Sequence, residues 1–511
     1  MLRVFGISGT ELAAFPMNKL ASSVDKQMNH GCSWEACPVN TMMCHLRRSH
    51  GFPICIQRLL RDGTSLTERD ELESPADLQL VLLDPTNVSA SIVAEELVEY
   101  AAVNGDIHVA SALLKGRADV NSQDRKGMSA LICAASEGRI ELVHFLLEAG
   151  ASTNLHDNGG MTALAHAARQ GCFEAVKPLL EAGADFNLRD LRGMSPLAQA
   201  SSLGFFHIAR LLLETGADVD LESFTGCTPL MGAVLNEHPD VVFLLLEARA
   251  ETDWQDWNGM TAVMHAVSRN DTEVLQLLLE ADADLDLQEL HKGQTALYAA
   301  TWRGHVEVAS LLLAAGACPD VPDLNGKTPL MLASEAGAVD LVHSLLDYWA
   351  WQDSQDNAGA TALMWASSCG EIAVLRLLLQ AGSDKELPDN EGKTALHVAC
   401  RKGRADAVSL LLEAVSNKEV RDPLNATPFH YACDGGHVRV VRLLLSASAD
   451  MEIQDHVGMT PLMRSCCAGH VQVVRALLRA GCDKNLCDHG GLTALLHASY
   501  EGHVEVKSLL V

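Results

Sequence analysis

The sequence predicts a mainly α-helical solenoid preceded by a small α+β domain. Three observations lead to this fold class. The chain has 511 residues, which is too long for one compact core. Its hydrophobic content of 48% is mostly small and aliphatic, since aromatic residues make up only 5%, and this suits close helix packing. A glycine, one further residue, Thr or Ser, and then Pro or Ala recur at nearly constant spacing along most of the chain.

The recurring motif has a period of 33 residues. Its glycines are Gly127, Gly160, Gly193, Gly226, Gly259, Gly293, Gly326, Gly359, Gly392, Gly458 and Gly491. Asn425 fills the one gap, and only one step has 34 residues instead of 33. Thr or Ser is a good helix N-cap, and Pro or Ala suits the first helical turn. A helix is therefore expected to begin at every repeat of the motif.

The rest of each repeat is equally regular. About nine residues after the cap there is usually a second glycine, followed by a second apolar run such as "HVEVASLLL" at 305–313. Three residues before the first glycine, Asp stands in ten of twelve repeats, where its carboxylate can accept from the amides of a turn. Each repeat is thus predicted to be a short helical hairpin, a loop and a projecting β-hairpin finger.

This pattern resembles the ankyrin repeat, whose signature stands nearly intact as "TALHVA" at Thr394–Ala399 and as "TPFHYA" at Thr427–Ala432. The resemblance covers residues 92–511 and about 13 units, of which the first, "EELVEYAAVNGDIHVASALL", has a polar outer face typical of a capping repeat. The chain ends at "VEVKSLLV" inside a second helix, whose apolar face we expect a partner or further chain to cover.

The first ninety residues have a different pattern. "MLRVFGISG", "TELAAFPM", "QRLLRDGTSL" and "DLQLVLL" are predicted strands, and "VNTMMCHLRRSHG" is a predicted helix. This order suggests a β-grasp, and "HGFPICIQRLLRDG" resembles ubiquitin. The predicted domains are a ubiquitin-like domain at 1–84 with an insertion near 25–38, a linker at 85–91 and the ankyrin array at 92–511.

The resemblance to ubiquitin implies a recognition patch at Leu60, Gln79 and Val81. Such a patch engages ubiquitin-binding proteins or proteasome receptors, or else it packs on the first ankyrin units. The chain continues as Asp84-Pro85-Thr86 where ubiquitin ends in a free diglycine, so conjugation through that terminus is excluded.

A zinc finger is a rival interpretation of part of this region. Cys32, Cys37, His50 and Cys55 have a spacing close to that of zinc ligands. The apolar positions expected between the two ligand pairs are poorly met, and the ubiquitin resemblance accounts for His50 to Cys55 as a helix end and a strand entry. No metal and no cofactor are predicted.

Motifs of catalysis are missing from the sequence. It contains no phosphate-binding loop, zinc-protease helix, nucleophile elbow or kinase signature. Histidines recur at fixed positions of the first helices, which favours hydrogen bonding within the stack. They are His166, His265, His397, His430 and His497. The chain is therefore predicted not to be an enzyme.

Charge and composition restrict the partners. The net charge of −28 disfavours nucleic acid and favours protein partners with basic surfaces. No apolar run approaches the roughly 18 residues that span a bilayer. Fifteen scattered cysteines fit a reducing compartment, so a cytoplasmic location is expected, with the nucleus as an alternative.

The predicted partner site is a groove formed by finger tips and first helices, on the concave surface of the solenoid. Six of the seven tryptophans lie between 254 and 365. The residues expected to bind a partner, centred on 224–368, are Phe224, Trp254, Trp257, Tyr298, Trp302 and Trp365.

The segment "DYWAW" at 347–351 departs from its siblings. Trp349 occupies a helix C-terminal position that is Gly in six of twelve repeats. We expect Trp349 and Trp351 to fill a gap between neighbouring loops, with a partner contact as the alternative.

The function predicted from these features is an adaptor that grips a protein and links it to ubiquitin or proteasome machinery. The alternatives are a regulatory or targeting subunit of an enzyme, and a membrane-skeletal tether that binds basic cytoplasmic tails.

Overall fold

The computed structural model describes residues 2–5, 11–15, 57–61, 64–65, 78–82, 94, 97–98, 105 and 107–511. The chain divides into two compact units, Met1–Glu251 and Thr252–Val511, and each is described by itself. The predicted helix at 39–51, the insertion and the linker lie outside the described residues. The domain boundaries stay predictions.

The first unit begins with a five-stranded sheet. Its strands are β1 (Leu2–Phe5), β2 (Glu11–Phe15), β3 (Gln57–Arg61), β4 (Thr64–Ser65) and β5 (Leu78–Leu82). Their order is β2-β1-β5-β3-β4. β1 runs parallel to β5, and the other neighbouring pairs are antiparallel. The strands lie within the four segments that the sequence predicted as strands.

The rest of the first unit consists of helices in pairs. They are α4 (Ile107–Lys115), α5 (Ala130–Ser136), α6 (Ile140–Glu148), α7 (Ala163–Gln170), α8 (Phe173–Glu181), α9 (Pro196–Ser202), α10 (Phe206–Glu214), α11 (Pro229–Leu235) and α12 (Pro239–Glu247). From α5 onward, the odd-numbered helix is the first of its repeat and the even-numbered helix is the second.

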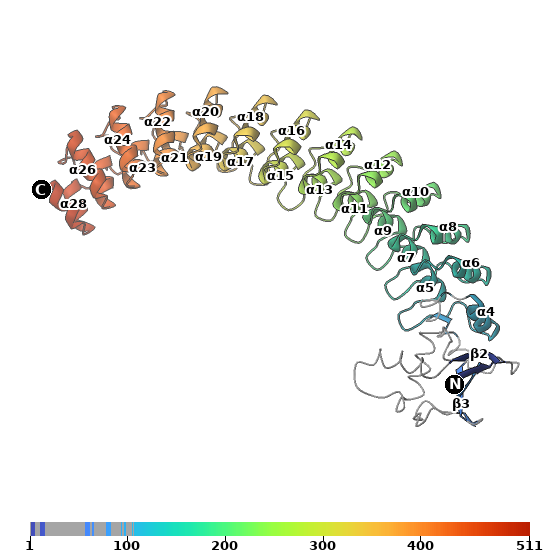
Figure 1. Cartoon of the computed structure of the whole chain (residues 1–511). Coiled ribbons are helices and arrows are strands. Elements are labelled where there is room, and N and C mark those ends of the chain that lie inside the picture. The colour runs from blue at the N-terminus through green and yellow to red at the C-terminus, as the bar shows by residue number, and fades with distance from the viewer. Residues whose placement is uncertain are drawn as a thin grey trace. The chain divides into compact units, whose positions relative to one another are not determined.

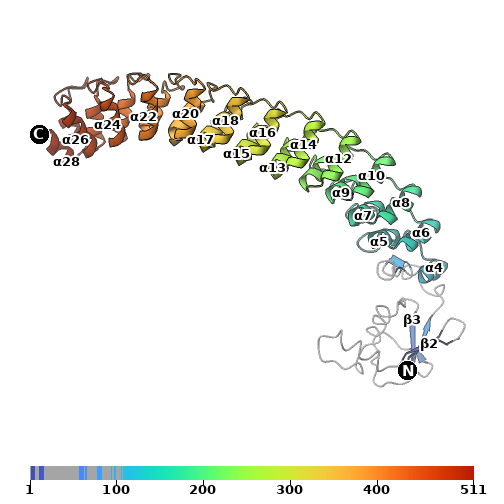
Figure 2. The same cartoon turned by 45° about the horizontal axis from the view of Figure 1, so that its top comes forward.

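The second unit continues the same pattern. Its helices are α13 (Ala262–Arg269), α14 (Thr272–Glu280), α15 (Ala296–Arg303), α16 (Val306–Ala314), α17 (Pro329–Ala336), α18 (Val339–Asp347), α19 (Ala362–Cys369), α20 (Ile372–Gln380), α21 (Ala395–Arg401), α22 (Ala405–Glu413), α23 (Pro428–Asp434), α24 (Val438–Ser446), α25 (Pro461–Cys467), α26 (Val471–Ala480), α27 (Ala494–Tyr500) and α28 (Val504–Leu510). In both views these pairs follow one another in chain order (Figure 1, Figure 2).

The first helices begin where the sequence predicted. Thr162 Oγ1 accepts from the amide of Ala165 at 3.2 Å, and Thr328 Oγ1 accepts from Met331 at 3.4 Å. These hydroxyls satisfy amides that the first helical turn leaves without a partner. Thr162 and Thr328 are buried, so the loss of either hydroxyl would leave a donor without water as well as without protein.

The core of each unit is formed by stacked helices that repeat one apolar pattern. In the second unit Leu278, Leu312 and Leu345 occupy the same position in successive second helices, and each is fully buried. Ala266 and Ala300 repeat in the first helices and are also fully buried. Small side chains let the helices approach closely, while the leucines supply roughly 1.5–3 kcal/mol of burial each.

The predicted β-hairpin fingers are turns instead of strands. In the described residues, isolated bridges occur only at Gln123 with Ser129, His156 with Thr162, and Cys487 with Thr493. The other fingers are closed by backbone hydrogen bonds around a four-residue turn, as where Gly193 N donates to the Asp190 carbonyl at 2.8 Å. The same turn closes the bridged fingers, as where Gly127 N donates to the Asp124 carbonyl at 2.9 Å, so turn length does not separate the two kinds of finger.

Gly193 shows why the motif requires glycine. Its φ is +79°, a conformation that favours glycine over other residues. A Cβ added there would lie 2.4 Å from the backbone nitrogen of Phe224 in the next finger. That nitrogen donates to the carbonyl of Arg192 at 2.9 Å, so neighbouring fingers are joined by their backbones.

Candidate functional site

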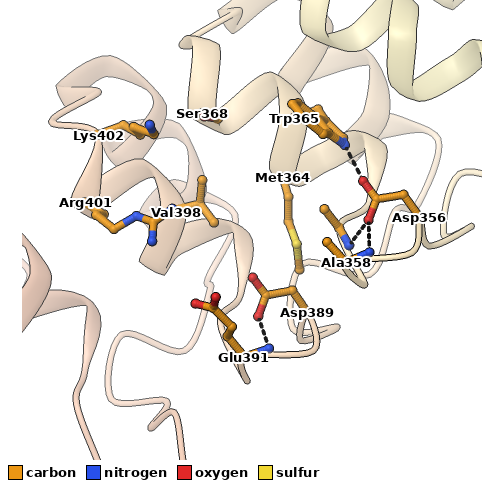
Figure 3. A pocket seen from close by; sticks show the side chains of 11 residues that line it. Asp356, Ala358, Met364, Trp365, Ser368, Asp389, Glu391, Val398, Arg401 and Lys402 are labelled. Atoms are coloured by element: carbon orange, nitrogen blue, oxygen red, sulfur yellow. Dashed lines mark hydrogen bonds between the residues drawn. The ribbon is translucent and has the colours of Figure 1, made fainter. Parts of the chain in front are cut away.

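The finger face, defined as the turn tips together with the first helices, is built around the recurrent aspartate. Asp356 Oδ1 accepts from the amides of Ala358 and Ala360, both at 2.9 Å. Its Oδ2 accepts from Nε1 of Trp365 on α19 at 3.1 Å, as Figure 3 shows. One carboxylate therefore closes the turn and ties it to the helix that follows.

The side chain that donates to Oδ2 stands nine residues after the aspartate, and its chemistry varies. The donors of this kind are His166, Gln199, His265, Trp365, Tyr431, Arg464 and His497. The sequence analysis placed the three histidines in the stack but missed the other four. A donor-bearing residue nine positions after seven of the ten aspartates was the signal that could have found them.

Five of the twelve repeats lack a donor to Oδ2 at the ninth position, and two of them show how the finger is held instead. After the single 34-residue step the aspartate is replaced by Glu289, whose longer side chain accepts from the amides of His291 and Lys292 in a longer turn. In the repeat of Asp389 the ninth residue is Val398, which carries no donor. Its finger is held by the Asp389 carboxylate and the amides of Glu391 and Lys393.

At Asp157 and Asp455 the donors lower the pKa of the carboxylate. Burial alone would raise the pKa of Asp157, but hydrogen bonds from His166 and two backbone amides outweigh it and lower the pKa. Burial likewise opposes ionisation of Asp455, where Arg464 and two amides hold the pKa below its usual value. These two fingers therefore keep their charge at neutral pH, which contributes to an acidic face.

His397 and His430 form a second class of histidine. Nδ1 of His397 accepts from the amide of Thr394 at 3.1 Å, and its Nε2 lies 3.3 Å from the carbonyl of Ala426 in the next repeat. His430 repeats this bridge one unit later. Burial lowers the pKa of His397 to about 4 and also lowers that of His430. The expectation that these histidines hydrogen-bond within the stack is confirmed.

Tyr298 does not face an open groove, and that part of the sequence analysis was wrong. It is only 4% exposed, and its hydroxyl donates to Asp323 Oδ2 of the next finger at 3.0 Å. Tyr298 stands at the same distance from its N-cap as His397, so it performs the same bridging task between repeats. A partner cannot contact it without displacing the stack.

The other aromatic residues of the predicted site are accessible to different degrees. In the second unit Trp257 is 69% exposed and Trp302 is 60% exposed, while Trp254 is 38% exposed and Trp365 is half-buried. In the first unit Phe224 is half-exposed at a finger tip, with the guanidinium of Arg189 5.4 Å from its ring centroid. Trp257 and Trp302 therefore offer the largest indole surfaces of this set.

Cavities open between neighbouring repeats of the second unit. One of about 320 Å³ is lined by Met260 and Met264 on one side and by Trp302 on the other. Another of about 340 Å³ is lined by Met364, Trp365 and Val398 (Figure 3). Each cavity combines an indole with a flexible methionine, a lining that suits apolar or aromatic side chains of a partner.

The expectation that Trp349 and Trp351 fill a gap between loops was also wrong. Trp349 is 90% exposed and Trp351 is 62% exposed. Trp349 has φ +64°, which costs a bulky residue about 1 kcal/mol, and burial does not compensate for it. The neighbouring loops are joined without the indoles, because Asp320 and Asp353 accept hydrogen bonds from backbone amides of the next loop.

The predicted ubiquitin-like patch lies on two adjacent strands. Leu60 of β3 is paired with Gln79 of β5, and Val81 is two residues further along β5, opposite Arg58. Residues at such register positions belong to one face of a sheet. The strand order thus places the three positions together.

The described part of the chain contains neither a metal site nor a membrane-spanning helix. No group of His, Cys, Asp or Glu there is arranged to hold a metal ion. The zinc-finger set, Cys32, Cys37, His50 and Cys55, lies outside the described residues. None of the described helices is long and apolar enough to cross a membrane.

The fold and the finger face define a repeat protein built from stacked helical hairpins. A family model for ankyrin repeats matches residues 98–190, 182–256, 233–323, 315–389, 381–455 and 447–511. Because these matches cover most of the chain, the chain belongs to the ankyrin-repeat family, whose members generally act as protein-interaction modules. A comparison with curated proteins gave no match.

Proposed function

We propose that the chain is a non-enzymatic adaptor that binds a protein partner through the finger face around Trp257 and Trp302. The observation that carries this proposal is the exposure of Trp302 beside the cavity lined by Met260 and Met264. Tryptophan is enriched in interface hot spots, and an indole in water beside an apolar cavity gains by covering both.

The chemistry of the partner follows from charge. The chain carries a net charge of −28, and the finger carboxylates contribute to it. A partner with a basic surface is attracted at long range and oriented before contact. The partner segment we propose therefore combines apolar anchors with Lys or Arg.

We also propose that the N-terminal segment links the partner to ubiquitin or proteasome machinery. The support is the residue pattern shared with ubiquitin, together with the strand order β2-β1-β5-β3-β4 and the shared register of Leu60, Gln79 and Val81. Ten of the described cysteines, among them the buried Cys133, Cys400 and Cys433, are free thiols, which favours the cytoplasm or the nucleus as the place of action.

The experiment is affinity capture from native lysate with the full-length chain as bait. Trp257→Ala combined with Trp302→Ala should reduce affinity for the main partner by at least about thirtyfold, because two hot-spot indoles are lost. Leu191→Ala is the matched control, since it removes an exposed finger-tip residue outside the proposed site and should leave affinity unchanged. Wild-type affinity in the double variant would contradict the proposed site.

The ubiquitin link is tested with the same bait carrying Leu60→Ala and Val81→Ala. We expect proteasome subunits or ubiquitin receptors to disappear from the captured set while the finger-face partner is retained. If the wild-type bait captures none of them, this part of the proposal is wrong. An enzyme as the retained partner, with a rate that the chain changes, would favour a regulatory subunit over an adaptor.

A further inference from the structure

A second exposed aromatic surface lies directly after the C-terminal end of α18. In each repeat this position precedes the finger in sequence. We call Tyr348, Trp349 and Trp351 the loop patch. Their exposed fractions are 42%, 90% and 62%. Three large aromatic side chains within four residues of a short loop are more than scattered surface exposure, and such groupings mark interaction sites.

The protein gains nothing from Trp349 within its own fold. Its left-handed backbone is the conformation that six sibling repeats reach with glycine. The loop is already closed by Trp349 N and Ala350 N, which donate to the carbonyls of Leu346 and Leu345 at 3.1 and 3.0 Å. Five other repeats also hold a non-glycine residue in this conformation, Val415 among them, so it is the exposure of the ring that points to a use outside the fold.

Hydrogen bonds to both neighbouring repeats hold the backbone of the loop patch, and the corresponding loops of those repeats carry small side chains. The amide of Trp351 donates to Asp320 Oδ1 of the preceding repeat at 2.9 Å, and Asp353 Oδ1 accepts from the amide of Asp384 in the next at 2.8 Å. The corresponding loops carry exposed small residues at 314–316 and 381–382. The indoles are therefore held in place and are not screened by larger side chains on either side.

The charge around the patch indicates what would cover it. Residues 328–375 contain six Asp or Glu and no Lys or Arg. Asp347 and Asp353 flank the patch in sequence, and the carboxylate of Asp347 pairs with the exposed ring of His343 at 2.7 Å. A membrane rich in anionic lipids would be repelled, whereas a cation is attracted both to carboxylates and to the faces of indoles.

We propose that the loop patch binds an arginine-bearing segment of a protein, with a guanidinium stacked on Trp349 and Trp351 and paired with Asp347 or Asp353. Arginine fits better than lysine because its planar group stacks on an aromatic face while its N–H groups reach a carboxylate. This surface is separate from Trp257 and Trp302, so it gives the chain a second binding site that does not rest on the proposed function.

The test uses the full-length chain labelled with 5-fluorotryptophan. The probe is a synthetic peptide of alternating arginine and glycine, and the matched peptide carries neutral citrulline in place of arginine. We expect the fluorine resonances of Trp349 and Trp351, assigned by their loss in Trp349→Gly and Trp351→Asp, to shift with the arginine peptide. The affinity for the citrulline peptide should be lower by at least about tenfold.

Trp349→Gly restores the residue of sibling loops, so its fold should be intact, which an unchanged or higher urea midpoint verifies. It should weaken binding of the arginine peptide about tenfold. Val415→Gly is the matched control, because Val415 has the same positive φ and is 82% exposed in another repeat. It should leave binding unchanged.

Three outcomes would overturn the proposal. The first is equal affinity of Trp349→Gly and wild type for the arginine peptide. The second is a shift confined to Trp257, Trp302 or Trp365, which would assign the cation to the finger face. The third is a shift of the loop-patch resonances with vesicles of phosphatidylcholine and phosphatidylserine but not with the peptide, which would assign the patch to a membrane.

Discussion

At the scale of single residues, Trp349 has a left-handed backbone conformation that is unfavourable for a residue with a large side chain. Six sibling loops place glycine at this position, and the indole is almost fully exposed. Trp349→Gly should therefore raise the free energy of unfolding by roughly 0.5–1 kcal/mol, since the strain is removed and no burial is lost. Urea unfolding of the full-length chain measures this, and a lower midpoint would contradict the account of the loop.

His397 couples stability to pH. Burial lowers the pKa of its ring to about 4, against 6.5 for an unperturbed histidine. Between these values the unfolded chain binds a proton that the folded chain does not, so the free energy of unfolding falls as pH decreases through this window and is restored above it. The loss from this residue is on the order of 2 kcal/mol by about pH 4.5.

The matched variant is His397→Gln, which keeps a side-chain donor for the Ala426 carbonyl but cannot titrate. Urea unfolding at about pH 7.5 and pH 4.5 should show a smaller decrease for the variant than for the wild type. His265, His305 and His430, whose pKa values burial also lowers, remain in both proteins and contribute equally to the slope of each. Equal decreases in the two proteins would show that His397 is not the titrating group.

At the scale of the element, the finger depends on its aspartate. Asp190 is 4% exposed and accepts from the amides of Arg192 and Met194 and from Nε2 of the buried Gln199. Asp190→Ala should lower the free energy of unfolding by about 2–4 kcal/mol, because buried donors lose their acceptor. Faster amide exchange at Arg192 and Met194 should accompany the loss.

Asp389→Ala is the control for that prediction. Its ninth following residue is Val398, so the carboxylate serves only the turn amides, and it is less buried than Asp190. The loss of stability should be smaller than for Asp190→Ala. Equal losses in the two variants would mean that the bond to the first helix contributes little.

Most of the element boundaries could be predicted from the sequence. The N-cap Thr or Ser, the following Pro or Ala and the 33-residue spacing determine where each first helix begins, because those interactions are local. The shape of the fingers could not be predicted in the same way. Asp and Gly at the same spacing close the bridged finger at Gly160 and the unbridged finger at Gly193, and the next finger approaches both glycines closely, so neither feature predicts a bridge.

At the scale of the whole molecule, the sequence predicted the exposure of only some residues of the candidate partner site. The exposed positions of Trp257 and Trp302 followed from the repeat phase, whereas the burial of Tyr298 did not. Tyr298 is buried because Asp323 of the next repeat accepts from its hydroxyl, a contact 25 residues away that no local pattern contains. The ubiquitin-like domain, its patch and the partner stay predictions.

Repetition makes the array a series of similar surfaces, and only side chains that differ between repeats can select a partner. On the finger face the differing residues include Trp257 and Trp302, and at the loop ends they include Trp349. We therefore propose that the finger face of the second unit binds the main partner.

Hydrogen–deuterium exchange of the full-length chain, with and without the captured partner, tests this claim most directly. We expect slower exchange in the fingers near Trp257 and His291 and in α15, with second helices α14 and α16 unchanged. Slower exchange confined to second helices, with these fingers and α15 unaffected, would contradict it.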